Sequence, residues 1–335
     1  MKLTVSDKII LANEFEKAAQ SYEKLKYEIK KVIVGQDNLI EKIFLAILMG
    51  GHCLVEGPPG LAKTLIIKSF SAAIQSHFAR IQFTPDLTPS DLTGMQLYNP
   101  LNHTFEFKEG PIFTNLLLVD EINRAPAKVQ SALLECMQEK QVTIAGQTHR
   151  MEELFVVLAT QNPQEHEGTY PLPEAQIDRF ALKLIVDYPE QHDEESILLR
   201  FCSGNLEPEI NNVCTVEEIL QMRKLIDKVF IEPKIIQKIV KLVQASRKPQ
   251  SFGLKDLNNI IAHGASPRAS IYLAQASKGL ALLRGRNYVL SQDLYDVVFD
   301  ILRHRIQPSH RAQIDGIEAE NIIQSLANKF ILMES

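Results

Sequence analysis

The stretch Gly57-Pro-Pro-Gly-Leu-Ala-Lys63-Thr64 decides the fold. It follows the apolar run His52–Glu56 and precedes residues 63–76, which have helical periodicity. A loop of small residues between a strand and a helix lets backbone N–H groups approach phosphate oxygens, and the positive end of the helix then faces the anion. The sequence therefore predicts a phosphate-binding loop, with an ordinary Gly/Pro turn between strand and helix as the alternative.

Two side chains of this loop carry its chemistry. We expect Lys63 to reach the β- and γ-phosphates of ATP and Thr64 to hold Mg²⁺. Ala62 stands where the usual pattern has glycine; alanine costs roughly 1–2 kcal/mol there if φ is positive, and nothing if the residue is helical. The residues predicted to bind nucleotide around the loop are Gly57, Pro58, Pro59, Gly60, Leu61, Ala62, Lys63, Thr64 and Leu65.

Short apolar runs alternate with helical stretches from about residue 50 to residue 187. Runs that are apolar throughout are typical of parallel strands buried on both faces. Alternating strands and helices predict an α/β fold, a P-loop NTPase parallel sheet flanked by helices. The predicted strands are residues 52–56, 78–84, 116–120, 155–160 and 182–187, and the predicted helices between them are 63–76 and 126–139, with Pro126 at a first helical position.

Other segments surround this sheet. An amphipathic helix is predicted over residues 12–33, and β-hairpins are predicted at 94–113 and at 141–150, the second turning at Ala145–Gly146. After Pro189 the strand patterns disappear. Helix-start signals follow at Thr215-Val-Glu-Glu218, Pro233, Pro267 and Ser291. We therefore expect two domains, residues 1–189 with the sheet and a smaller all-helical domain over 190–335.

The run Leu116-Leu-Leu-Val-Asp120-Glu121 ends in two carboxylates. Asp120, at the carboxyl end of a buried strand, can hold Mg²⁺ directly or through water. Glu121 can polarise a water molecule for attack on the γ-phosphate. Solvated acids at a strand end are the alternative, and the phosphate-binding loop upstream favours the catalytic interpretation.

Three further polar residues complete the predicted site. Asn162, after the run 155–160, can hydrogen-bond the attacking water or the γ-phosphate, although Asn-Pro also starts ordinary turns. Arg179 is either a surface cation or a finger inserted into a neighbour's ATP site. Arg268 follows Pro267 in the first turn of a predicted helix, where a cation opposes the helix dipole. A nearby anion explains that position, and a structural salt bridge is the alternative.

Composition restricts the class of protein. The chain has 335 residues, of which 45% are hydrophobic and 23% charged, and its net charge is −5. An acidic chain has no overall attraction to nucleic acid or anionic membrane. No apolar segment has the length of a membrane span, the first residues lack a signal-peptide pattern, and the four cysteines form no zinc spacing. We therefore expect a cytoplasmic protein without nucleic-acid partners or membrane insertion.

The chain resembles the MoxR-type AAA+ ATPases, relatives of the magnesium-chelatase ATPase subunit, from about Lys31 to about Arg305. Many ordered segments carry the resemblance. They are Val34-Gly-Gln-Asp37, GPPGLAKT, FTPDLTPSDLTG ending at Gly94, Glu109-Gly-Pro, LLLVDEINRAP, MQEKQVTIAG, ATQNP, GTYPLPEAQIDRF, GASPRAS and Arg284-Gly-Arg-Asn-Tyr288.

The resemblance implies an AAA+ αβα core with a C-terminal lid and Mg²⁺-dependent ATP hydrolysis. It also assigns roles to residues, and Ala62 becomes the expected residue at its position. The assignments are Lys63 and Thr64 in Walker A, Asp120 and Glu121 in Walker B, Asn162 as sensor 1, Arg179 as arginine finger, Arg268 as sensor 2, and Val34 and Gly35 beside the adenine.

The resemblance further implies a homo-hexameric, chaperone-like ring that remodels or activates client proteins, often ones with von Willebrand factor A domains. Residues 94–113 and 141–150 then correspond to insertions that project toward the pore. Three alternatives stay open: a magnesium-chelatase-like motor, an ATP-binding scaffold with little turnover, and a DNA motor. Glu121, Asn162 and Arg179 argue against the scaffold, and the acidic charge argues against the DNA motor.

Overall fold

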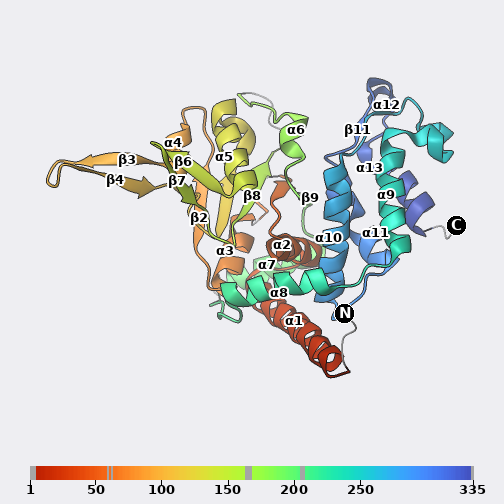
Figure 1. The fold of residues 1–335 in the computed structure, drawn as a ribbon, viewed down its shortest axis with the longest axis horizontal. Helices are drawn as coiled ribbons and strands as arrows, with labels where there is room; N and C mark the ends of the chain where they lie inside the picture. Colours follow the sequence, from red (N-terminus) through yellow and green to blue (C-terminus); the bar gives the residue numbers. More distant parts are fainter. Residues whose placement is uncertain (1–4, 59, 62, 163–167, 204–207, 333–335) are drawn as a thin grey trace. The chain divides into compact units, whose positions relative to one another are not determined.

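The computed structural model describes residues 5–58, 60–61, 63–162, 168–203 and 208–332. The chain divides into two compact units, both drawn in Figure 1. We call Lys24–Phe180 with Leu184–Leu220 the sheet unit. We call Gln221–Ser335, together with Met1–Glu23 and Ala181–Lys183, the C-terminal unit.

A five-stranded sheet with the order β2-β5-β8-β1-β9 organises the fold. The pairs β1–β8, β5–β8 and β2–β5 are parallel, which confirms the predicted parallel sheet. All five predicted strands are present. Their bounds are β1 Cys53–Glu56, β2 Phe78–Gln82, β5 Leu116–Asp120, β8 Val156–Gln161 and β9 Leu182–Ile185.

The strands differ in burial. Residues 116–119 of β5 and 156–160 of β8 are buried, as an apolar run between two helical layers requires. In β2, by contrast, Arg80 and Gln82 are exposed and the other three residues are half-buried. The prediction that every run is buried on both faces is therefore wrong for β2, because β2 lies at the edge of the sheet.

Helices α2 to α7 belong to the sheet unit, and α1 contributes residues to both units (Figure 1). The predicted helices are present, and Pro126 caps α5 from outside instead of occupying its first position. No sequence pattern predicted α2, because apolar residues surround most of that helix and hide its period; nine of its residues are buried. The bounds are α1 Val5–Val32, α2 Asp37–Met49, α3 Lys63–Ala73, α4 Pro89–Thr93, α5 Ala127–Glu139, α6 Glu174–Ile177 and α7 Gln191–Cys202.

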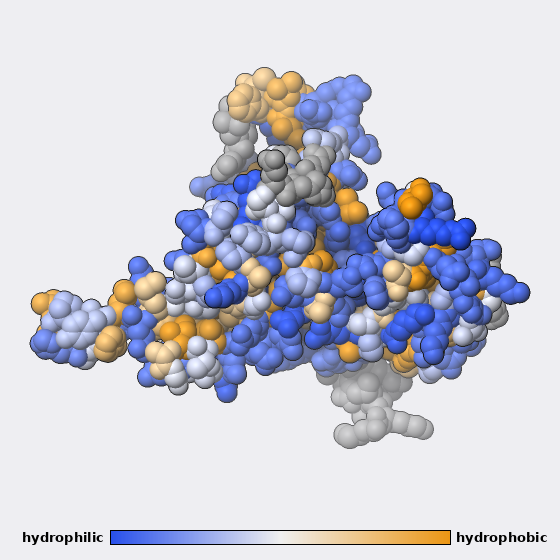
Figure 2. Space-filling model, turned by 90° about the horizontal axis from the view of Figure 1, so that it is seen from above, coloured by the Kyte–Doolittle hydropathy of each residue, from blue (hydrophilic) through white to orange (hydrophobic). Residues whose placement is uncertain are grey.

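Both predicted hairpins are present, as β3 Gly94–Asn99 with β4 Thr104–Glu109 and β6 Gln141–Ile144 with β7 Gln147–Arg150. The β3–β4 hairpin projects away from the sheet (Figure 1), and Figure 2 shows apolar side chains along this arm. Leu101 at its tip is 88% exposed. The two hairpins touch through aromatic rings, because His149 of β7 stacks on Phe107 of β4 with 4.1 Å between ring centroids.

The region after Pro189 is mainly helical. Thr215 and Glu218 form the predicted capping box, with Thr215 N–H donating to the Glu218 carboxylate at 2.9 Å, and Pro233 and Pro267 lie in first helical turns. The helices are α8 Val216–Lys228, α9 Pro233–Arg247, α10 Pro267–Leu283, α11 Ser291–Leu302, α12 His310–Ile314 and α13 Ala319–Ala327.

A short antiparallel pair corrects the expectation that this region is all-helical. It joins β10 Ile261–His263 to β11 Gln307–Pro308. Segments of two and three residues are too short for a strand periodicity to be visible in the sequence.

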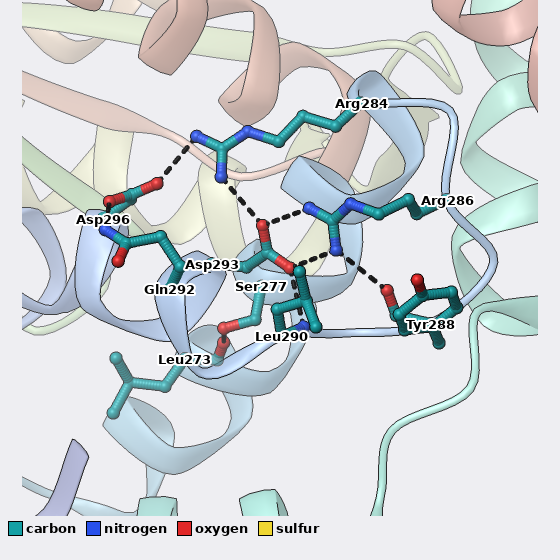
Figure 3. A network of polar contacts seen from close by, with 9 residues as sticks. All are labelled: Leu273, Ser277, Arg284, Arg286, Tyr288, Leu290, Gln292, Asp293 and Asp296. Atoms are coloured by element: carbon teal, nitrogen blue, oxygen red, sulfur yellow. Dashed lines mark hydrogen bonds and ion pairs between the residues drawn. The ribbon is translucent and has the colours of Figure 1, made fainter. Parts of the chain in front are cut away.

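A buried carboxylate fixes the turn between α10 and α11 (Figure 3). Asp293 is fully buried and accepts from Arg284 Nη1 at 2.8 Å and from Arg286 Nη2 at 2.6 Å. Its second oxygen accepts the backbone N–H of Leu290 at 2.8 Å. Arg284 also pairs with Asp296 at 2.7 Å. One carboxylate therefore neutralises two cations and caps the start of α11.

We expect Asp293→Ala to lower the free energy of unfolding by about 3 kcal/mol, because removing one partner of a buried ion pair costs roughly 3–5 kcal/mol. The value lies at the lower end since Arg284 and Arg286 are 32% and 20% exposed. Urea denaturation followed by circular dichroism measures the change. Asp296→Asn is the matched control, with an expected loss of about 1 kcal/mol or less; equal losses for both variants contradict the burial argument.

Candidate functional site

The strand order brings the predicted site residues to one edge of the sheet. β1 leads into the Gly57–Thr64 loop, β5 ends at Asp120, and β8 lies between these two strands. The carboxyl ends of parallel strands meet at the same edge, and ligands of open α/β sheets bind there. Asn162, directly after β8, therefore lies between the loop and the two carboxylates.

The loop has the backbone geometry that its glycines predict. A Cβ at Gly57 would lie 2.4 Å from the carbonyl oxygen of Val186, so no larger residue fits without a shift of the chain. Gly60 has φ of 85°, which favours glycine. Lys63 opens α3 and donates from Nζ to the Gly57 carbonyl at 2.7 Å, across the base of the loop. The predicted contacts Pro59 and Ala62 lie outside the described residues.

The Lys63 ammonium lies within electrostatic reach of the acidic strand ends. Burial lowers the pKa of Lys63, while the charges of Asp120, Glu56 and Glu121 oppose that shift. A cation near three carboxylates at the ends of parallel strands is suited to a polyphosphate with its metal ion, since the cation attracts the phosphate oxygens and the carboxylates attract the metal.

Asp120 is held by two partners. Arg80 Nε on β2 pairs with its Oδ2 at 2.6 Å, and Thr160 Oγ1 at the end of β8 donates to its Oδ1 at 3.3 Å. Both partners come from strands that flank β5 in the sheet. The carboxylate therefore has a fixed orientation at the sheet edge.

Glu121 is positioned by its backbone and by two side chains. Its φ of 55° is left-handed, which is uncommon for a residue other than glycine and is concentrated at functional sites. Its N–H donates to Thr160 Oγ1 at 3.0 Å. Gln82 Nε2 donates to its carboxylate at 2.7 Å, and Arg124 Nε pairs with the same oxygen at 2.9 Å. The carboxylate is thus held by two side chains and is about one-third exposed.

Sequence reasoning missed Arg80, Gln82, Thr160 and Arg124 as contacts of the two carboxylates. Arg80 and Gln82 are two residues apart on β2, and this polar alternation in an otherwise apolar run was the available signal. That signal could not identify the partner strand, because only the order β2-β5-β8 places these residues beside Asp120 and Glu121.

The two predicted arginines lie in different units. Arg179 belongs to the sheet unit, follows α6 and is partly exposed. Arg268 belongs to the C-terminal unit and lies in the first turn of α10, where its N–H donates to the Ser266 hydroxyl at 3.2 Å. The helix start predicted at Pro267 is confirmed.

An apolar pocket of about 250 Å³ adjoins the loop within the sheet unit. Val34 and Gln36 contribute from the turn before α2, Leu61 from the loop, and Ile197 and Phe201 from α7. The predicted contact Leu65 also lines it. Gly35 packs on α7 instead, because a Cβ there would lie 2.3 Å from Asp193 Oδ2. An apolar pocket with a few polar groups beside a phosphate-binding loop fits a planar base.

The donors also fit a magnesium ion. Among the described residues, no group of three or more His, Cys, Asp or Glu side chains could hold a metal by itself. Magnesium is usually bound by one or two protein oxygens, with waters and substrate phosphates completing its shell. The Thr64 hydroxyl lies in the first turn of α3, and the Asp120 carboxylate lies at the end of β5. These two groups would supply such a pair of protein oxygens.

No helix in the described part of the chain is both long and apolar enough to cross a membrane.

Known proteins are similar to this chain in sequence and in fold. The profile of the ATPase family associated with various cellular activities matches residues 52–182, and that of the AAA lid domain matches residues 256–326. The chain is 45% identical to Chaperone MoxR1 of Mycobacterium tuberculosis over 90% of this chain and 79% of that one. It is 40% identical to the protein YeaC of Bacillus subtilis over 89% and 90%. A crystal structure from Cytophaga hutchinsonii has a TM-score of 0.90 and 44% identity, covering 95% of this chain and 96% of that one.

Proposed function

The chain belongs to the MoxR-type AAA+ ATPases and hydrolyses ATP, and from this premise we propose that it is a Mg²⁺-dependent ring motor that remodels or matures partner proteins. The observation that carries the proposal is that Lys63, at the base of the loop after β1, and Asp120 and Glu121, at the end of β5, lie at the carboxyl ends of parallel strands of one sheet. That arrangement combines phosphate binding, a metal ligand and a general base.

The residues divide the chemistry among them. Lys63 binds the β- and γ-phosphates, and the pocket of Val34, Leu61 and Leu65 receives the adenine. Thr64 and Asp120 would hold Mg²⁺, whose charge would neutralise the negative charge that develops on the phosphate oxygens. Glu121 takes the proton of the attacking water, while Asn162, at the tip of the neighbouring strand, orients that water.

Assembly supplies the remaining cations. We assign Arg179 to the ATP site of a neighbouring subunit in a homo-hexamer, where it neutralises the transferring phosphoryl group. Arg268, in the lid, contacts the nucleotide of its own subunit. The division of the chain at residue 189 and a cytoplasmic location belong to the same proposal.

The exposed hairpins support a protein client. The β3–β4 arm carries exposed Leu97, Tyr98, Leu101 and Phe105, and apolar and aromatic side chains at a projecting tip suit contact with another polypeptide. The similar protein of Mycobacterium tuberculosis bears the name chaperone. Clients with von Willebrand factor A domains are the first class to test. A magnesium-chelatase-like motor is the second candidate, and a metal-insertion assay with its partner subunits distinguishes it.

The first test is the ATPase rate per subunit against protein concentration, with and without Mg²⁺. We expect the specific rate to rise with concentration to a plateau and to require Mg²⁺, because each site is completed by the neighbour's Arg179. Analytical ultracentrifugation over the same concentrations monitors assembly. A rate independent of concentration while the oligomer dissociates contradicts the ring mechanism, and ATP binding with negligible turnover at full assembly favours the scaffold.

Thr160→Val is expected to lower kcat by roughly tenfold, because small misplacements of catalytic groups are costly in rate. Valine has the shape of threonine but neither accepts from the Glu121 N–H nor donates to Asp120. KM for ATP is expected to stay within about twofold, since the loop contacts are untouched. Thr148→Val, at an exposed threonine of β7, is the matched control. Unchanged kcat in Thr160→Val shows that the other contacts suffice to position Glu121.

A further inference from the structure

Within the described part of the chain, strand β9 pairs with another strand on one side only. It is the last strand of the sheet, paired on one side with β1. The Val186 N–H donates to the Glu56 carbonyl at 2.8 Å, which orients the peptide groups of residue 186 toward β1. Because peptide groups alternate along a strand, those of residues 182 and 184 also face β1 and those of 181 and 183 face away. Carbonyls that face away from β1 need donor partners from elsewhere.

Two arginines supply those partners. Arg303 Nη1 donates to the Lys183 carbonyl at 2.8 Å, and Arg305 Nη1 donates to the Ala181 carbonyl at 3.3 Å. Their spacing of two residues matches the spacing of the two carbonyls. All four residues belong to the C-terminal unit, in which residues 181–183 are clustered. Guanidinium groups thus bond both carbonyls of this segment that face away from β1.

Both guanidinium groups are fixed in place. Arg303 is held by Asp300 at 2.8 Å and by Glu320 at 3.1 Å, and its side chain is 13% exposed. Arg305 is buried, donates to the Ile301 carbonyl, and lies over the Tyr272 ring at 5.1 Å from its centroid. Because both side chains are already held in one orientation, they lose little conformational entropy when they bond the strand. They therefore fix the position of the two carbonyls.

The segment that the two arginines hold, residues 181–183, begins two residues after Arg179. Phe180 is fully buried in the core of the sheet unit, and the chain passes to Ala181 in the next residue. Two residues span at most about 7 Å, so Ala181 and Arg179 cannot move independently over larger distances. The position of the Arg179 backbone is therefore restricted from its C-terminal side. The burial of Phe180 and the hydrogen bonds that Ala181 and Lys183 accept both restrict it.

We propose that Arg303 and Arg305 are positioning residues for Arg179: by bonding the carbonyls of Lys183 and Ala181, close after the finger in the chain, they set how the subunit presents Arg179 to the neighbour's ATP. The inference rests on the proposed role of Arg179. It implies that a substitution of Arg303 or Arg305 slows ATP hydrolysis in the site of the next subunit and not in the subunit's own site.

The first measurement is steady-state ATP turnover of Arg303→Ala and Arg303→Lys. We expect kcat of Arg303→Ala to fall roughly tenfold with KM for ATP within about twofold, since nucleotide binding in the same subunit is untouched. Lysine can still donate to one carbonyl, so Arg303→Lys is expected to recover part of the rate. Arg311→Ala, at an arginine 79% exposed on α12, is the matched control. Thermal melts and sedimentation verify folding and assembly of each variant.

Mixed rings then locate the defect. Arg303→Ala subunits mixed with Lys63→Ala subunits are expected to regain turnover, because the intact loop of the first meets the intact finger of the second. Arg303→Ala mixed with Arg179→Ala is expected to regain none, because both lack a working finger. The opposite pattern places the defect in the subunit's own ATP site, near the lid residue Arg268, and overturns the proposal.

The control mixture of Lys63→Ala with Arg179→Ala separates the two levels of inference. If this mixture regains turnover and the Arg303 mixtures do not follow the expected pattern, the positioning role fails while the finger stands. If the control itself regains nothing in well-assembled rings, the finger assignment fails and the positioning role falls with it. Unchanged kcat in Arg303→Ala also overturns the positioning role.

Discussion

Glu121→Gln is expected to bind ATP normally and to lower kcat by roughly 10²–10⁴-fold, the range that a positioned general base contributes. The amide keeps the size of the carboxylate and can keep one hydrogen bond with Gln82, but it cannot accept the proton of the attacking water. Loop contacts from Lys63 and the apolar pocket are unaffected. Little change in stability follows, because the Arg124–Glu121 pair is 41% and 32% exposed.

Single-turnover hydrolysis and equilibrium binding of a fluorescent ATP analogue measure the two expectations separately. Glu139→Gln, at the exposed end of α5, is the matched control and should retain the parent rate. A Glu121→Gln protein with most of its activity shows that another residue orients the water. If binding falls together with hydrolysis, the carboxylate contributes to the nucleotide site itself, and its assignment as base is wrong.

Arg179→Ala is expected to lower turnover by roughly 10³–10⁵-fold, as loss of an arginine finger does. Its loop, carboxylates and pocket remain intact, so ATP affinity in a single subunit changes little. The loss is expected to act in trans: mixing Arg179→Ala with Lys63→Ala subunits returns part of the rate, because one interface in the mixed ring combines an intact loop with an intact finger.

Rate against mixing ratio is the decisive measurement for this variant. A maximum at an intermediate ratio, absent from either variant alone, identifies Arg179 as a residue of the neighbour's site. As the control, Arg311→Ala subunits are mixed with Lys63→Ala subunits in the same proportions. Their rate should only fall as the fraction of Lys63→Ala rises. A steady decline across all ratios in assembled rings places Arg179 outside the interface, and a wild-type rate in the variant alone removes it from the chemistry.

The fold could be predicted from the sequence where local patterns were strong. Five apolar runs predicted the five strands, and the Gly57–Thr64 loop and the Ala145–Gly146 turn lie between the elements expected for them. The α2 helix escaped prediction because burial on most sides removes helical periodicity. The exposed side of β2 escaped because an edge position is a property of the assembled sheet.

The candidate site divides in the same way. Lys63, Asp120 and Glu121 could be named because each belongs to a contiguous motif. Thr160 was visible only as part of a strand end, although its hydroxyl joins the Glu121 backbone to the Asp120 carboxylate. Arg303 and Arg305 are about 120 residues distant in sequence from the carbonyls they contact, and no local pattern connects such partners.

The ring stack between the two hairpins has a mechanical consequence. His149 stacks on Phe107 and meets Phe113 edge-on at 6.2 Å, so a displacement of the long β3–β4 arm is transmitted sideways to β7. Five residues connect the end of β7 to the start of β8, the strand that contains Thr160 and ends at Gln161. A client that binds the arm therefore contacts a hairpin that packs, through one imidazole, against the strand leading to β8, whose Thr160 contacts Asp120 and Glu121.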